Sequence, residues 1–100
     1  MTANNPSQSE TITAENTFTP ALPVTPGQRV SVSLSGVTDS TVTLQRRLDG
    51  ANWRDVKNYT ADAEETYLSD ESGDVRFGVK TGNYGTDTIT ARVGVGGGVI

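Results

Sequence analysis

Two clusters of acidic residues are the side chains whose types and spacing could do chemistry. The first contains Asp62, Glu64 and Glu65, and the second lies within residues 70–74. Paired carboxylates can act as acid and base in glycoside hydrolysis, or bind Ca²⁺. Hydrolysis needs a cleft that desolvates one acid, which a chain this short rarely builds. The second cluster lacks the alternating ligands and the distal glutamate of an EF-hand loop. We expect both clusters to be solvated turn charges, with no metal site.

Other kinds of catalysis lack their usual residues. The sequence has no histidine and no cysteine, which removes imidazole bases, thiolate nucleophiles, disulfides and nearly every transition-metal site. Serines are numerous, but no histidine can activate them, and Lys57 and Lys80 occupy outward positions of expected strands. The glycines at 94 and 96–98 precede neither a Lys-Ser pair nor a helix, so they form no phosphate loop. We expect a non-enzymatic protein with no catalytic residue and no cofactor.

Length and charge narrow the class of protein. One hundred residues make a single domain, and the hydrophobic fraction of 33% predicts a thin core. The net charge of −4 opposes binding to nucleic acid or to an anionic membrane. No stretch approaches the ~20 apolar residues of a membrane span, and the N-terminal residues do not resemble a signal peptide. The lack of cysteine favours assembly in a reducing cytosol. We expect a soluble protein.

Alternating apolar residues predict strands throughout the chain. Residues 28–35 give the clearest pattern, because every second residue is apolar and the rest are polar. Residues 41–56 predict a hairpin with an Asp-Gly turn, in which Trp53 opens the return strand. A bulge near residues 54–55 is expected to bring Trp53 and Val56 to one face. As the largest apolar side chain, Trp53 is expected in the core, with these neighbours across two sheets: Val32, Leu44, Phe77 and Val93.

The spacing of these strands defines the expected architecture. Six to eight strands recur about every ten residues with no convincing helix, which predicts an all-β fold, a small antiparallel β-sandwich. An immunoglobulin-like or fibronectin-like sandwich is the first expectation, and a jelly roll or small barrel is the alternative. Residues 1–20 are expected to be an extended N-terminal arm, residues 21–95 the β-sandwich domain, and residues 96–100 a Gly-rich C-terminal tail.

Two segments carry a family resemblance. Residues 42–56 read VTLQRRLDGANWRDV, and residues 75–93 read VRFGVKTGNYGTDTITARV. They resemble small structural proteins of tailed bacteriophages, in which a Leu-Gln-Arg, Asp-Gly, Trp hairpin precedes an Arg-Phe-Gly-Val-Lys-Thr-Gly strand and a Gly/Thr-rich hairpin. The resemblance covers about residues 28–95. Arg47 stands where those proteins typically have Ser or Thr, and one Gly is missing from the turn. Fibronectin-type modules share the same skeleton.

The resemblance implies a role in a virion. It indicates a capsid decoration (cement) protein that stabilises the head, with a head–tail or tail accessory protein and a carbohydrate- or surface-binding module as alternatives. The implied partner is the major capsid protein, the implied state is a homo-oligomer, most simply a trimer, and the implied location is the capsid surface after assembly in the host cytoplasm. No nucleic acid or membrane partner is expected. The expected partner-contact residues are Phe18, Leu22, Val24, Tyr84, Val99 and Ile100.

Overall fold

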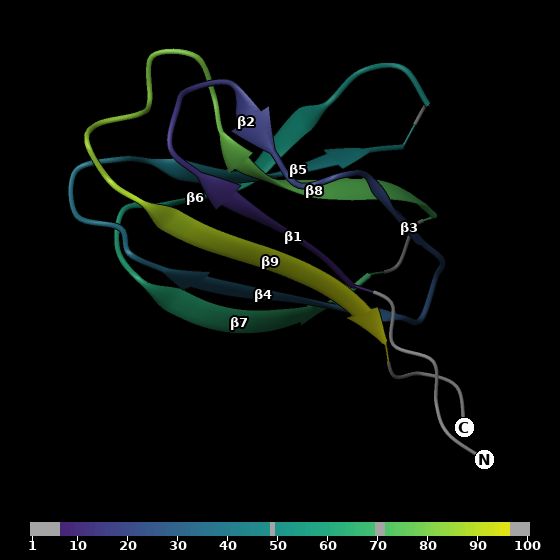
Figure 1. Cartoon of the computed structure of the whole chain (residues 1–100). Helices are drawn as coiled ribbons and strands as arrows, with labels where there is room; N and C mark the ends of the chain where they lie inside the picture. The colour runs from purple at the N-terminus through teal and green to yellow at the C-terminus, as the bar shows by residue number, and fades with distance from the viewer. Residues whose placement is uncertain (1–6, 49, 70–71, 97–100) are drawn as a thin grey trace.

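The computed structural model describes residues 7–48, 50–69 and 72–96. They form nine strands, drawn as arrows in Figure 1, and no helix. In chain order the strands are β1 (Ser7–Ile12), β2 (Thr17–Phe18), β3 (Leu22–Val24), β4 (Arg29–Ser35), β5 (Val42–Arg47), β6 (Arg54–Tyr59), β7 (Ala63–Leu68), β8 (Gly73–Val79) and β9 (Ile89–Gly96). A membrane-spanning helix is therefore absent from the described ranges.

The strands form two antiparallel sheets that face each other (Figure 1). The first sheet has the order β1-β9-β4-β7, and the second has the order β2-β8-β5-β6, with β3 also paired to β8. Every observed strand pair is antiparallel. The expected small antiparallel β-sandwich is thus confirmed.

The order of the strands is that of a jelly roll. When β2 and β3 are counted as one interrupted strand, the pairs are β1 with β9, β2/β3 with β8, β4 with β7, and β5 with β6. A long hairpin rolled onto itself gives this nested pairing. In an immunoglobulin-like sandwich the last two strands pair within one sheet, whereas β8 and β9 here lie in different sheets. The strand order therefore corresponds to the jelly-roll alternative and not to the first expectation.

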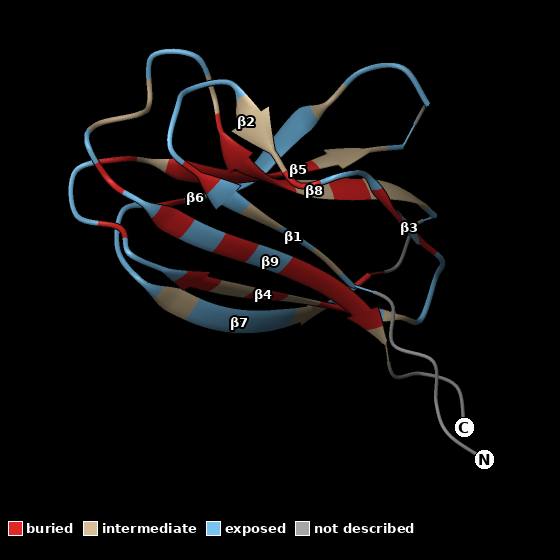
Figure 2. Ribbon diagram, in the orientation of Figure 1, coloured by how far each residue is buried: buried red, intermediate tan, exposed pale blue. Residues whose placement is uncertain are grey.

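The core fills the space between the sheets and follows the predicted alternation. Along β4 and β9, buried residues alternate with more exposed ones, as the banding of β9 in Figure 2 shows. Phe77 on β8 is the largest fully buried side chain. Its ring meets that of Tyr59 edge to face, with 5.5 Å between the centroids. Such aromatic pairs add to the stabilisation from burial alone.

The chain before residue 20 differs from the expected arm. β1 pairs with β9 over six residues, from Ser7 opposite Gly94 to Ile12 opposite Ile89. Ile12 is fully buried, and β2 pairs with β8 in the other sheet. A single buried apolar residue is enough here because the backbone ladder, not the side chains, attaches an edge strand to its sheet. Residues 7–18 therefore belong to the sandwich. Of the expected tail, Gly96 ends β9 and residues 97–100 lie outside the described ranges.

Two loops at one end of the sandwich are tied together by Asp87. Its carboxylate accepts hydrogen bonds from the backbone N–H groups of Thr38, Asp39 and Ser40, at 2.9 to 3.2 Å, and from the Thr38 hydroxyl. Asp39 in turn accepts from the backbone and hydroxyl of Thr86. The hydrogen bonds from Thr38 above all hold the pKa of Asp87 well below its usual range. These hydrogen bonds of Asp87 and Asp39, which we call the clasp, hold the β4–β5 loop against the β8–β9 loop.

Candidate functional site

The outer face of the second sheet carries a connected set of polar and aromatic side chains. β5 lies inside this sheet, so its outward residues are covered by side chains from the strands on both sides. Thr43 is fully buried and its hydroxyl donates to Asn58 on β6, with 2.8 Å between the oxygens. Gln45 is only 6% exposed. Alternation places these two residues on the outside, but it does not reveal that neighbours cover them.

Four side chains on this face form a stack of alternating aromatic rings and guanidinium groups. The Arg76 guanidinium lies 4.0 Å from the ring centroid of Phe18 and 4.4 Å from that of Trp53. The Arg47 guanidinium also lies 4.4 Å from the Trp53 centroid. We call Phe18, Arg76, Trp53 and Arg47 the arginine–aromatic stack. Cations are attracted to the electron-rich faces of aromatic rings at such distances.

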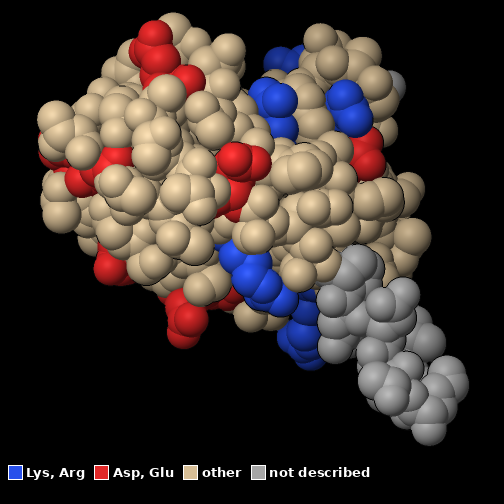
Figure 3. All heavy atoms as spheres, in the orientation of Figure 1, with Lys and Arg blue, Asp and Glu red and all other residues tan. Residues whose placement is uncertain are grey.

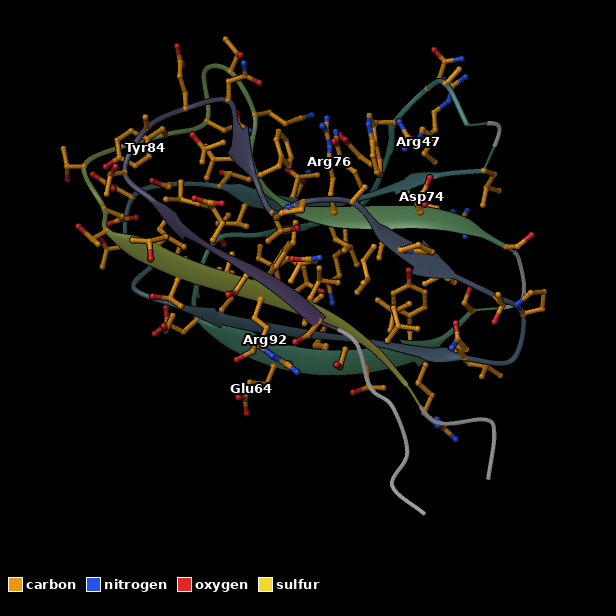
Figure 4. All side chains as sticks on the ribbon, turned by 45° about the vertical axis from the view of Figure 1, so that its right-hand side comes forward. Arg47, Glu64, Asp74, Arg76, Tyr84 and Arg92 are labelled. Atoms are coloured by element: carbon orange, nitrogen blue, oxygen red, sulfur yellow. The ribbon has the colours of Figure 1, made fainter. Side chains whose placement is uncertain are left out.

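The sheet register explains why these residues meet. Arg76 on β8 lies directly opposite Gln45 on β5, and Arg47 lies opposite Asp74. Phe18 lies opposite Gly78, where an added Cβ would collide with the backbone of β2. Gly78 therefore allows β2 to lie close enough for the Phe18 ring to contact Arg76. Figure 4 shows Arg76, Arg47 and Asp74 together on the outer side of β8 and β5.

The position of Trp53 corrects the expected core. Trp53 is half-buried and belongs to the stack, while Tyr59 is the second aromatic residue of the core beside Phe77. Leu44 pairs with Lys57 and Gln45 pairs with Asp55, so Val56 is left over as a bulge in β6. Val56 itself is 40% exposed. A bulge does occur next to the expected position, but it does not bring Trp53 into the core. One feature of the sequence indicates the outer position of Trp53. Alternation places Arg47 on the outer face, where an aromatic ring can cover its guanidinium group.

Hydrogen bonds lock Arg76 from one side. Its Nε donates to Gln45 Oε1 at 2.8 Å, and Gln45 Nε2 donates to Asp55 Oδ1 at 2.9 Å. The other oxygen of Asp55 pairs with Lys80, with 2.6 Å between Nζ and Oδ2. The hydrogen bond from Lys80 lowers the pKa of Asp55. Burial lowers the pKa of the Arg76 guanidinium, and the nearby charge of Arg47 adds to this effect. Gln45 thus connects a carboxylate to a guanidinium through its two amide atoms.

The second guanidinium of the stack has a carboxylate partner. Arg47 donates to Asp74 Oδ2 from Nη2 at 3.0 Å and from Nε at 3.3 Å. Arginine stays protonated at neutral pH, so the stack offers fixed positive charge and hydrogen-bond donors and no acid–base group. In Figure 3 the Lys and Arg spheres form two groups, one at the upper right, over the β5–β6 end of the sheet, and one at the lower centre, while most Asp and Glu spheres lie towards the left. The arrangement suits binding of a negative group.

The expected partner-contact residues lie in different environments. Phe18 is half-buried in the stack. Leu22 and Val24 are 3% and 5% exposed and belong to the core, because β3 pairs with β8 and turns both side chains inward, so neither is exposed for the expected partner contact. Tyr84 is half-buried against the core, and its hydroxyl donates to the Asp87 carbonyl oxygen. The remaining expected contacts, Val99 and Ile100, lie outside the described residues.

The first acidic cluster does not converge on one point. Asp62 accepts from the Val37 backbone at 2.9 Å, while Glu64 accepts from the Ser33 hydroxyl at 3.2 Å. Glu65 bonds to Lys57 and to the Tyr59 hydroxyl, at 2.7 and 2.8 Å. Of the second cluster, Asp74 pairs with Arg47, and residues 70 and 71 are not described. Within the described residues, no three potential metal-ligating side chains come together.

A hollow lies at the open side of the sandwich, between the edge strands β6 and β7. It has a volume of about 380 Å³, and its apolar lining includes Val32, Leu44 and Val56. The Lys57–Glu65 ion pair lines it too, and charges turned inward at sheet edges protect against edge-to-edge pairing. The stack and this hollow are the two surface features that the geometry distinguishes. Comparison with known proteins found no match to the chain among protein-family models, curated proteins or solved structures.

Proposed function

We propose that this protein is a non-enzymatic structural component of a tailed-phage virion, a decoration (cement) protein that binds the major capsid protein on the outer surface of the head. The observation that carries the proposal is the jelly-roll strand order. Jelly rolls are used by viral capsid domains and by lectins. The strand order thus links the protein to capsid proteins by analogy of fold. The sequence resemblance over residues 28–95, which contain β4 to β9, adds to it.

The proposed role requires surfaces that bind other proteins and does not require a catalytic site. A cement protein stabilises a shell by mass action, because only the assembled lattice offers the complete binding site. We propose a homotrimer, since three linked copies convert weak single contacts into strong attachment. The polar outer faces of both sheets are available for such contacts, and the first sheet presents Ser, Thr and Arg residues there.

The geometry gives less support to a carbohydrate-binding module. A sugar ring stacks on an exposed aromatic face, as ligand sites generally combine such a face with a few polar groups. Two guanidinium groups already lie over the Trp53 ring, each 4.4 Å from its centroid. Tyr59 is buried, and Tyr84 packs against the core. None of these three rings is free to form a sugar platform.

Copy number in purified particles tests the proposal. A decoration protein follows the icosahedral lattice, so quantitative mass spectrometry should find on the order of hundreds of copies per particle. Particles that lack the protein should lose their genome at a lower temperature, and purified protein added back should restore the original temperature. A count of about three to twelve copies would instead match the symmetry of a portal or tail position and would overturn the decoration role. Complete absence from virions would overturn the structural role altogether.

A further inference from the structure

We propose that Arg76 is the centre of a carboxylate-binding site, which takes a single Asp, Glu or C-terminal carboxylate of a protein partner. The site is formed by the arginine–aromatic stack on the outer face of β8 and β5. This proposal does not depend on the virion role, because it concerns a ligand that purified protein can bind alone.

The guanidinium of Arg76 is held in place with most of its donors unused. Phe18 and Trp53 lie against it at 4.0 and 4.4 Å, and its Nε is occupied by Gln45. Arginine has five N–H donors, and this hydrogen bond uses one of them. Neither terminal nitrogen of Arg76 donates a hydrogen bond to the described residues. The two terminal nitrogens therefore form a fork that the rings and Gln45 have already oriented.

The charges around Arg76 leave one positive charge without a partner. Arg47 pairs with Asp74, and Lys80 pairs with Asp55. These two pairs and Arg76 together carry a net charge of +1, and of the three cations only Arg76 forms no ion pair with a described residue. The lowered pKa of Arg76 agrees with a guanidinium that is partly removed from water. A bound carboxylate would compensate this charge in a site less polar than open water, where attraction is stronger.

The same geometry favours one carboxylate over other anions and over ring-shaped ligands. A guanidinium fork binds two oxygens of a carboxylate or of a phosphate in a bidentate arrangement, and the net charge of +1 matches the single charge of a carboxylate better than the nearly double charge of a phosphate group. Single-stranded nucleic acids and sugars stack on open aromatic faces, but two guanidinium groups already lie over the Trp53 ring, each 4.4 Å from its centroid. A polyanion would bring more negative charge than the net charge of +1 at this site compensates. Because Arg76 is held before binding, little conformational entropy remains to be lost.

Trp53 provides a direct readout, since it is the single tryptophan of the chain and contacts Arg76. Sodium acetate, and then a short Asp/Glu-containing peptide, would be titrated at constant ionic strength against sodium chloride. The Trp53 indole N–H and the Arg76 Nε–H would be followed by ¹⁵N NMR. Saturable shifts of both signals are expected. Arg76→Gln should bind acetate at least about tenfold more weakly, because it loses charge-assisted hydrogen bonds. Arg92→Gln, on the outer face of the first sheet, is the matched control and should bind like the parent protein.

Each result decides for or against the site. If Arg76→Gln loses structure by circular dichroism, Arg76→Lys provides the test, since it keeps the charge but not the fork and should also bind more weakly than the parent. Equal binding by the parent and by the folded Arg76 variants would overturn the proposal, as would the absence of saturable shifts. Tighter binding of inorganic phosphate or of an oligonucleotide than of the acidic peptide would overturn the carboxylate assignment. All of these measurements use purified protein without virions, so their failure would leave the proposed function untouched.

Discussion

Removing the indole of Trp53 tests whether this residue stabilises the sandwich from its outer face. Trp53 is half-buried between two guanidinium groups, each 4.4 Å from the ring centroid. A cation–π contact at a partly exposed site is worth about 0.5–1 kcal/mol. Partial burial of the ring adds about 1 kcal/mol. Trp53→Ala should therefore lower the free energy of unfolding by about 2–3 kcal/mol, as measured by urea denaturation with circular dichroism as the signal.

The loss of stability in Trp53→Ala can be compared with the loss at a core position, Phe77. Phe77 is fully buried and packs against Tyr59, so Phe77→Ala should cost about 3–5 kcal/mol. A double-mutant cycle of Trp53→Ala with Arg76→Gln should give a coupling of about 0.5–1 kcal/mol. If Trp53→Ala costs as much as Phe77→Ala, or if the cycle gives no coupling, the reasoning from the stack is refuted.

Three further predictions concern a tight contact and two titrating groups. Gly78→Ala should destabilise the protein by about 1–3 kcal/mol, because the added methyl meets the backbone of β2; Gly94→Ala, whose methyl would meet only side-chain atoms, is the control and should cost less in the same urea assay. The lowered pKa of Asp87 means that its contribution to stability is complete above its ordinary value, 3.8, and declines as the pH falls below it. The urea concentration at the midpoint of unfolding should therefore fall at acid pH, and it should fall less in Asp87→Asn. An equal fall in the variant and the parent would show that the hydrogen bonds of Asp87 do not stabilise the protein. Burial raises the pKa of Tyr59 above its ordinary value, 10.0, so its contribution is present below pH 10 and declines above it. Burial raises the pKa of Tyr67 too, so Tyr59→Phe identifies the signal of Tyr59 in an ultraviolet titration. Tyr59 should ionise only as the protein unfolds, and its ionisation in the folded protein would disprove this.

Side-chain alternation allowed the strands to be predicted wherever one face is apolar and the other polar. β4 is the clearest case, because Val30, Val32 and Leu34 alternate with polar residues and are all buried. β1 gives almost no such signal, since its inward side contains Gln8 and Glu10 before Ile12. Alternation also says nothing about which strands pair, so it could not separate the jelly roll from the immunoglobulin order.

The stack could be predicted only in part, for a physical reason. Outward positions for Arg47 and Arg76 follow from the alternation of their strands. The approach of Phe18 depends on the pairing of β2 with β8, and the place of Trp53 depends on the hairpin and its bulge. These are long-range properties of the register. A prediction from hydrophobicity alone places Trp53 in the core, because such a prediction leaves out the contacts by which arginine side chains can cover an indole ring.

The position of β9 has a consequence for the order in which the protein folds during synthesis. β9 is the last described strand, yet it lies inside the first sheet between β1 and β4. β1, at the other end of the described sequence, pairs only with β9 within that sheet. A ribosome must therefore release the chain through β9 before β1 can join its sheet, and contacts this distant in sequence form slowly. While translation continues, β4 has an unpaired edge where β9 will insert, and a nascent chain at this stage is the form most exposed to pairing with a neighbouring copy.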